Sequence, residues 1–331
     1  MGFSKDLLNN IRANASAEYQ ARVPEATQDN FLTVGNALET YDLLYNEFFP
    51  ALFNKIGKSH IESLLFKNKL AKYKSGVIFT QQDVEDIFVE MLAAEGAYDK
   101  TGPNPLGRRQ GPDVKSVYHR MNRQDYYVLT VGDIDVVRVF RNEGTLDAFI
   151  TAKFNAVYSG AEYDEWLHMK HLLASYDGYC DYGVPAITDA ASAAEFVKTV
   201  RKASTDMTFV STKLNKAGVK TKTDVKKQVL FINKDVLAEI DVEVLAKAFN
   251  MGKTDIQIDI EVMDDFGELE NTYGLLIDRD CIKVWDTLSK MEAQRNAQGL
   301  FTNYFYHVHQ ILSMSPFKNA IRLTTAEVAA E

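Results

Sequence analysis

Apolar residues recur at three- and four-residue intervals between residues 143 and 177, which is the spacing of one face of a helix. The apolar side chains on this face are Leu146, Phe149, Ile150, Phe154, Val157 and Ala161. Gly144 and Thr145 mark the start of the pattern, and Asp177-Gly178 marks its end. A helix of this span is about 45 Å long at 1.5 Å per residue. The pattern therefore predicts a spine across an elongated molecule, with this face buried.

Helix-type and strand-type patterns alternate along the chain after the spine. The predicted elements are a helix over 190–214, a strand over 229–232, a helix over 242–249, and strands over 256–262 and 273–277. Residues 285–323 are mainly strand-like. Their alternation places Tyr304, Tyr306 and Val308 on one face and Phe305, His307 and His309 on the other. These elements predict an α+β protein.

The N-terminal residues lack a pattern of this strength. Residues 1–35 are polar, with room for a short amphipathic helix at Leu7, Leu8 and Ile11. We interpret them as an arm that builds no core. Asn36 is predicted to cap a dense apolar helix that continues toward residue 57.

Residues 58–142 form a long excursion with little core. A helical stretch is predicted from the apolar residues Val84, Ile87, Phe88, Met91 and Leu92, and an extended return from residues 114–121. Between them, residues 102–112 hold three glycines and three of the seven prolines, which excludes a helix or a central strand. Long excursions of this kind are usually functional, because a compact domain gains little stability from them.

Charge and composition narrow the function classes. The chain has 331 residues, a formal charge of −9 and 46% hydrophobic residues, so it is a packed globular protein and not a dedicated nucleic-acid binder. Two cysteines are too few for a disulfide framework, and no secretion signal or membrane span is recognisable. We expect a soluble, cytoplasmic product. A lysine cluster is interpreted as a solvated surface, with an electrostatic partner contact as the alternative. Its members are Lys213, Lys216, Lys220, Lys222, Lys226 and Lys227.

Candidate chemistry is sparse. Gly57-Lys58-Ser59 and Gly252-Lys253-Thr254 resemble the end of a phosphate-binding loop, but the required earlier glycines are replaced by Leu52 and Lys247. The remaining candidates are short histidine and acidic clusters. They are His307 with His309, His168 and His171 beside Asp164 and Glu165, Asp264-Asp265, and Asp278-Arg279-Asp280. None has the ligand set of a metal site. We therefore predict no catalytic residue, no cofactor and no metal.

Several short motifs follow one another in a characteristic order. The N-terminal and loop motifs are Arg22-Val23-Pro24-Glu25-Ala26-Thr27, Pro112-Asp113-Val114-Lys115, Tyr118-His119 and Asn122-Arg123-Gln124-Asp125-Tyr126-Tyr127. The later motifs are Ala161-Glu162-Tyr163-Asp164-Glu165, Met169-Lys170, Leu245-Ala246-Lys247-Ala248-Phe249-Asn250 and Asn303-Tyr304-Phe305-Tyr306-His307. In this order they resemble the major capsid proteins of tailed bacteriophages with the Hong Kong ninety-seven-type fold. The likeness is to small podoviruses of Gram-positive hosts, the phi twenty-nine relatives.

The resemblance implies a domain plan. Residues 1–35 are the N-terminal arm, 36–57 a helix leading into the body, 58–142 the extended loop and return, 143–182 and 283–325 the peripheral domain, 183–282 the axial domain, and 326–331 a polar tail. Some relatives carry a C-terminal immunoglobulin-like domain, and we expect none here.

The resemblance also implies a function: self-assembly as pentamers and hexamers into an icosahedral or prolate head around double-stranded DNA. The implied partners are other copies of the chain, a scaffolding protein, a portal and non-specifically contacted DNA, with no membrane. The protein is expected in the virion, after assembly in the host cytoplasm. The intersubunit contact candidates are Arg22, Pro24, Glu25, Pro103, Pro105, Arg108, Arg109, Tyr118, Arg123 and Asp125.

Two alternatives stay open. One is a tail-tube or sheath subunit, which would form tubes instead of closed shells. The other is an α/β enzyme whose long loop is a lid, which would show perturbed carboxylates or histidines in a deep pocket.

Overall fold

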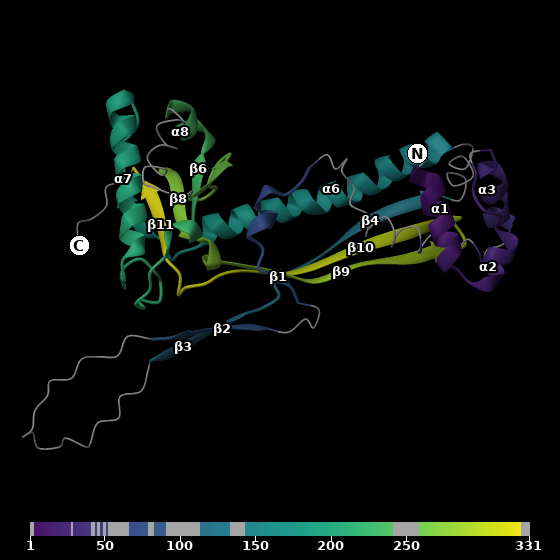
Figure 1. Ribbon diagram of the computed structural model, residues 1–331, viewed down its shortest axis with the longest axis horizontal. Coiled ribbons are helices and arrows are strands. Elements are labelled where there is room, and N and C mark those ends of the chain that lie inside the picture. The colour runs from purple at the N-terminus through teal and green to yellow at the C-terminus, as the bar shows by residue number, and fades with distance from the viewer. Residues whose placement is uncertain are drawn as a thin grey trace, which may run out of the picture.

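The computed structural model describes residues 3–27, 29–40, 44, 47–48, 51, 66–78, 83–90, 113–132, 143–240 and 258–325. Figure 1 shows an elongated molecule in which a compact sheet-and-helix domain occupies one end and N-terminal helices the other. A long helix and a long twisted sheet connect the two ends, and a β-hairpin projects from the middle. The predicted loop at 102–112 and helix at 242–249 lie outside the described residues.

The predicted spine is confirmed as α6 (Glu143–Ser175), a single helix of 33 residues. Val157 and Ala161 of the predicted apolar face are buried, and Met169 and Leu173 continue the burial toward the C-terminal end. The side chains of Leu146, Phe149, Ile150 and Phe154 lie outside the described part of the structure.

The compact end contains a five-stranded sheet, which we call the axial sheet. Its strands in spatial order are β5 (Cys180–Gly183), β11 (Ala320–Thr324), β8 (Thr272–Asp278), β6 (Gln228–Asn233) and β7 (Asp259–Met263). The predicted strands at 229–232 and 273–277 are confirmed, and β7 begins later than predicted. The short elements around the sheet are α8 (Lys234–Glu239), η2 (Val225–Lys227) and η3 (Arg279–Cys281).

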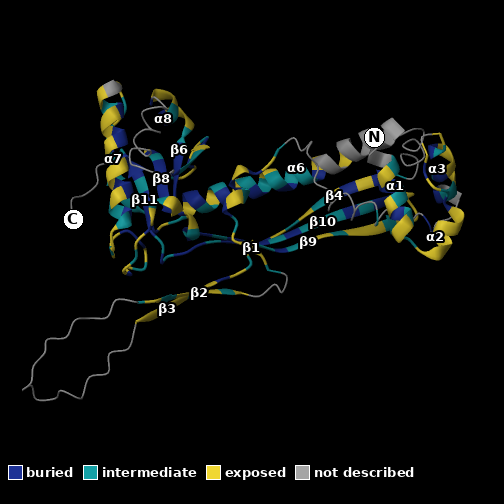
Figure 2. Ribbon diagram, viewed as in Figure 1, coloured by how far each residue is buried: buried dark blue, intermediate teal, exposed yellow. Residues whose placement is uncertain are grey.

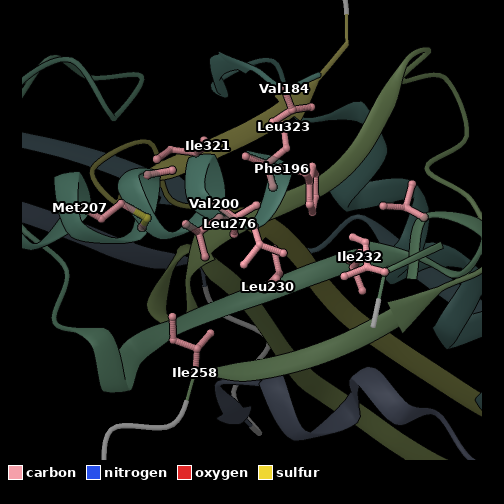
Figure 3. Packing of buried hydrophobic residues seen from close by; sticks show 14 of the residues in the cluster. Val184, Phe196, Val200, Met207, Leu230, Ile232, Ile258, Leu276, Ile321 and Leu323 are labelled. Atoms are coloured by element: carbon pink, nitrogen blue, oxygen red, sulfur yellow. The ribbon is translucent and has the colours of Figure 1, made fainter. Parts of the chain in front are cut away.

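Both faces of the axial sheet are covered. On one face, Phe196 and Val200 of α7 (Ala190–Thr208) pack against Leu230 and Leu276 (Figure 3). On the other face, the end of α6 and η1 (Lys69–Tyr73) pack against residues such as Phe231. A continuous apolar run forms β6 because neither of its faces meets water.

The helix predicted over 190–214 is shorter than expected. A capping box between Asp189 and Ser192 fixes its start, but α7 ends at Thr208. Leu214, which extended the apolar pattern, is buried where its carbonyl accepts a hydrogen bond from the Ala320 amide at 2.9 Å. Its burial thus belongs to a loop beside β11.

A second sheet, which we call the peripheral sheet, runs beside α6. Its order is β1 (Gly76–Val77), β9 (Ile282–Asn296), β10 (Phe301–Met314) and β4 (Arg123–Gly132). The β-type pattern predicted for 285–323 is confirmed by β9, β10 and β11. Of the residues predicted to share a face, Tyr304 and Val308 are buried and Tyr306 is half-buried, so this face is turned toward the core.

The N-terminal residues are not a coreless arm, so that interpretation was wrong. They form α1 (Phe3–Asn14), α2 (Ala17–Arg22) and α3 (Phe31–Thr40). Leu7, Leu8 and Ile11 are buried in one cluster with Leu129 and Val131 of β4. The three helices contribute buried side chains to this cluster and shield the end of the peripheral sheet.

The predicted boundary at Asn36 is also wrong. α3 begins at Phe31, and Asn36 lies within the helix. Phe31, Val34 and Leu38 are buried in the N-terminal cluster, so the apolar face of this helix starts five residues before the predicted cap. The later part of the predicted 36–57 helix is described only at isolated positions.

Val84, Ile87 and Phe88, which were predicted as part of a helix, form a strand instead, and Met91 and Leu92 of that prediction lie outside the described residues. β2 (Val84–Val89) pairs with β3 (Val114–His119) in an antiparallel hairpin. Exposure alternates along β2, so the period is two and not 3.6. The extended return predicted for 114–121 is confirmed by β3.

Candidate functional site

The β2–β3 hairpin has two different faces. One face, which we call the outer face, carries Ile87, Val89, Val114 and Tyr118, all of them exposed. Pairing of Val89 with Val114 and of Ile87 with Ser116 places these side chains together. Ile87, Val114 and Tyr118 are between 55% and 57% exposed. Exposed apolar side chains grouped in this way are typical of an interaction surface.

The opposite face of the hairpin is fixed to the body. The Ser315 hydroxyl donates to Asp86 Oδ2 at 2.6 Å, and His119 Nδ1 and Ser313 Oγ share a hydrogen bond of 2.6 Å. The Phe88 ring stacks on Phe317 with centroids 5.8 Å apart. The hairpin base is therefore held by the end of β10 and by the segment between β10 and β11. This part of the excursion contributes more packing than the sequence pattern predicts.

Burial shapes the electrostatics of this base. His119 is 1% exposed, and burial lowers its pKa even though Asp86 acts in the opposite direction. Its Nε2 lies 3.7 Å from Asp86 Oδ2 and has no hydrogen-bond partner. His119 is thus a neutral anchoring side chain at neutral pH.

The peripheral sheet has one face that the described chain does not cover, which we call the open face. Tyr126 and Val128 of β4 lie on it beside their cross-strand partners His307 and Phe305 of β10. The Tyr126 ring lies 6.0 Å from Phe305 and 6.1 Å from His307, measured between centroids. Tyr126 is 63% exposed. The arrangement is an aromatic platform that faces away from the core.

A buried polar network joins the spine to this sheet. Glu165 of α6 accepts hydrogen bonds from Lys74 Nζ at 2.9 Å, Gln310 Nε2 at 2.5 Å and Asn68 Nδ2 at 2.7 Å. Burial alone would raise the pKa of Glu165, but these donors together hold it below its usual range. Lys74 also pairs with Asp286 at 2.7 Å. The network locks helix, sheet and the segment before β1 in one arrangement.

Arg123 extends the network and is not a surface contact residue, which corrects its place among the candidates. It is 3% exposed, and its guanidinium donates to Gln310 Oε1 at 2.6 Å, Asp125 Oδ2 at 2.7 Å and the Tyr127 hydroxyl at 2.9 Å. The Tyr127 hydroxyl in turn donates to Asp164 at 2.8 Å. The Arg123 guanidinium therefore uses these hydrogen bonds to join β4, β10 and the spine inside the subunit.

The other contact candidates lie in three places. Arg22 and Glu25 are exposed and Pro24 is half-buried beyond α2, and Arg22 pairs with Glu18 at 3.3 Å. Tyr118 lies on the outer face, where a hydrogen bond from its hydroxyl to Glu85 raises its pKa. Asp125 lies 3.6 Å from His168. The remaining candidates are outside the described residues: Pro103, Pro105, Arg108 and Arg109.

The histidine and acidic clusters form no metal centre within the described ranges, where no group of three or more ligating side chains converges. A groove of about 730 Å³ contains His168, His171 and Asp125. It belongs to the gap between α6 and the β3–β4 turn. Asp278 instead accepts hydrogen bonds from Thr223 and from the Asp280 amide, and burial raises its pKa.

Sequence similarity agrees with this geometry. Residues 8–324 match the family model described as Phi29-like phage major capsid protein. The chain belongs to this family. The capsid protein is 34% identical to the major capsid protein of Bacillus phage B103, over 98% of this chain and 73% of that protein. It is 31% identical to the major capsid protein of Streptococcus phage Cp-1, over 95% of this chain and 92% of that one.

Solved structures support the fold. The capsid protein matches a chain in the capsid of Staphylococcus phage Andhra with a TM-score of 0.63 and 13% identity, over 81% of this chain and 88% of that chain. It matches a chain of the mature capsid of bacteriophage PhiM1 with a TM-score of 0.51 and 7% identity, over 82% and 90%. The predicted α+β, Hong Kong ninety-seven-type capsid fold is therefore confirmed.

Family membership decides between the open alternatives. The protein is a phage major capsid protein and a virion component, and not a tail-tube subunit. Membership of a structural family also implies that it is not an enzyme. No helix in the described part of the chain is both long and apolar enough to span a bilayer.

Proposed function

We propose that the capsid protein assembles as pentamers and hexamers into an icosahedral or prolate head around double-stranded DNA. In this proposal the outer face of one subunit's hairpin docks on the open face of its neighbour. Both faces are apolar and exposed in the single chain, and burying them together removes apolar area from water.

The observation that supports this contact is the direction of the two elements. The hairpin leaves the body near β1 and runs in one direction, while the peripheral sheet runs in the other (Figure 1). The two faces therefore cannot meet within one subunit. A contact between different patches of like subunits is heterologous, and it closes into a ring when the rotation between subunits allows. Pentamers and hexamers are such rings.

The proposal includes further partners and the domain plan. We propose that the shell is built in the host bacterial cytoplasm with a scaffolding protein and a portal, and that packaged DNA is contacted without sequence preference. The arm, extended loop, peripheral and axial divisions are retained, with the N-terminal helices packed on the peripheral domain. The acidic charge of −9 agrees with DNA that stays mobile inside the shell.

Electron microscopy of the purified full chain tests the proposal. We expect rings or closed particles, and we expect Ile87→Asp with Val114→Asp to abolish them, because each places a charge in an apolar contact. Asp113→Asn is a matched control outside the outer face, and it should assemble normally. Tubes in place of shells, or shells formed equally well by the double variant, would contradict the proposal.

A further inference from the structure

One part of the axial domain differs in charge from the rest of the protein. Residues 198–227 carry nine lysines and arginines against two aspartates, although the whole chain carries a net charge of −9. The segment includes the second half of α7, the loop after it and η2. It contains the lysine cluster that the sequence favoured as a solvated surface.

Four of the nine basic residues are exposed, as a solvated surface predicts, but they form ion pairs within the chain. Lys220 Nζ lies 2.7 Å from Glu90 of the hairpin, Lys227 Nζ lies 2.6 Å from Asp280, and Lys216 pairs with Asp177 at the end of the spine. Lys222 lies 3.6 Å from Asp224. Three of these pairs connect the segment after α7 to other parts of the chain, namely the hairpin, the end of the spine and η3.

The other five basic residues are exposed and form no ion pair with a described carboxylate. We call them the basic band, and they are Lys198, Arg201, Lys202, Lys213 and Lys226. The first three lie at the three- and four-residue spacing of one helix face, opposite the buried Phe196, Val200 and Ala203. The band is therefore a cationic surface that the subunit itself does not neutralise.

Backbone and side-chain hydrogen bonds connect the segments that carry the band. The Thr223 amide donates to the Met207 carbonyl at 2.7 Å, and the Ser204 hydroxyl donates to Gln228 at 2.6 Å. An antiparallel bridge joins Ser211 to Thr221. These contacts hold the loop and η2 at the C-terminal end of α7. The helix itself stands at the edge of the axial domain with an exposed side (Figure 2).

We propose that the basic band binds the phosphate backbone of double-stranded DNA without sequence preference. Lysine and arginine side chains neutralise phosphates and release bound counterions, which requires exposure and the absence of competing carboxylates. Both conditions hold for the band, whereas the other four basic residues are exposed but are already paired with carboxylates of the chain. The chain as a whole has a net charge of −9, which disfavours a polyanion elsewhere, so we place the contact on this band.

This inference rests on the proposed enclosure of DNA and adds the surface that touches it. Five neutralised phosphates predict a slope of about −4.5 for log K against log salt. Affinity should fall about 500-fold between 50 and 200 mM salt. A single subunit then holds DNA weakly at physiological salt, while many copies in a shell act together. Such contacts position DNA near the wall and still let it slide.

A binding titration of the unassembled full chain with a fluorescent 30-base-pair duplex tests the inference. The variant combines Lys198→Gln, Arg201→Gln and Lys202→Gln, and the matched control combines Lys67→Gln, Lys69→Gln and Lys153→Gln. Both sets remove three exposed positive charges. We expect the band variant to reduce the slope to about −2 and the control to keep it near −4.5. Electron microscopy of the band variant should still show normal shells.

Three results would overturn the inference. They are no duplex binding by the wild-type chain at 50 mM salt, equal slopes for band variant and control, and tighter binding of poly-glutamate than of duplex. The last result would identify an acidic protein segment as the partner, and Phe209→Ala should then weaken it, because Phe209 is 65% exposed beside the band. Loss of shells in the wild type would instead count against the proposed function.

Discussion

The two sheets of the capsid protein differ in how much of them the subunit itself covers. The axial sheet is covered on both faces, and every residue of β6 except the last is buried. The peripheral sheet is covered on one face by α6 and the N-terminal helices, and β4 alternates between buried and exposed positions. One sheet is thus complete within a subunit, and the other leaves an apolar face for a neighbour.

This difference assigns stability and assembly to different residues. Substitutions in the axial core should unfold the subunit, while substitutions on the open face should leave it folded and prevent assembly. A subunit that must exist unassembled before it joins a shell requires this separation, because a stable core cannot depend on contacts that form later.

The largest effect is expected for Phe231→Ala in the axial core. Phe231 is fully buried and contacts the Tyr73 ring edge-on with centroids 5.6 Å apart. Removing it should lower the free energy of unfolding by about 3–5 kcal/mol, measured by urea denaturation of the unassembled subunit. Phe209→Ala, at an exposed position, should change it by less than about 0.5 kcal/mol. Equal losses would mean that the axial sheet is not the core of the subunit.

A smaller effect is expected for Glu165→Gln, which leaves the shape of the network and removes its charge. The amide cannot accept hydrogen bonds as strongly as the carboxylate from Lys74 and Gln310, so unfolding should become easier by roughly 2–3 kcal/mol. Gln124→Glu, at an exposed position of β4, is a control for a one-charge exchange. A loss below about 0.5 kcal/mol would show that packing alone holds spine and sheet together.

Acid should act through the same carboxylate. The pKa of Glu165 is lower in the folded chain than in the unfolded one, so its contribution is present above the unfolded pKa of about 4.3 and is lost as pH falls through the folded value. The Glu165→Gln variant should therefore lose less stability than the wild type between pH 5 and strongly acid pH. Parallel pH profiles of thermal unfolding would contradict this assignment.

The smallest effect on folding is expected for Tyr126→Ser with Val128→Ser on the open face. Both side chains are exposed, so the free energy of unfolding of the subunit should change by less than about 0.5 kcal/mol. Shell yield in electron micrographs should nevertheless fall strongly. The control is Gln124→Ser on the same strand. A variant that unfolds more easily but still assembles would reverse the roles of the two sheets.

The sequence predicts an element well where its hydrophobic pattern fits only one kind of secondary structure. The spine and β6 are examples, because long helical spacing and a short, fully apolar run have few other interpretations. The strand β2 was missed because Val84, Ile87 and Phe88 also fit a helix, and only the contacts of Asp86 and Phe88 with the segment after β10 select a strand. Among the N-terminal helices, α1 agrees with the short amphipathic helix expected at Leu7, Leu8 and Ile11. The helix α2, the start of α3 and their shared core were missed, because their apolar residues are few and are buried together only in three dimensions.

The sequence predicts which segment takes part in assembly, but not which of its side chains are exposed for contact. A long excursion indicates an intersubunit element, but which side of the hairpin stays exposed depends on its pairing register with β3. Arg123 was chosen for its motif, whereas its burial depends on Gln310, 187 residues away in the sequence. Long-range contacts of this kind leave no local signal.

Thiol labelling of two variants, each with one exposed cysteine, is the most direct test that the hairpin of one subunit docks on the open face of another. The variants are Val114→Cys and Val128→Cys. The native Cys180 is replaced by serine in both, and Cys281 is buried. Each thiol is exposed in the unassembled subunit and should react with a maleimide rapidly. In assembled shells we predict that both react at least about tenfold more slowly, because docking covers both faces at once. Equal labelling rates in subunits and shells at either position would contradict the account.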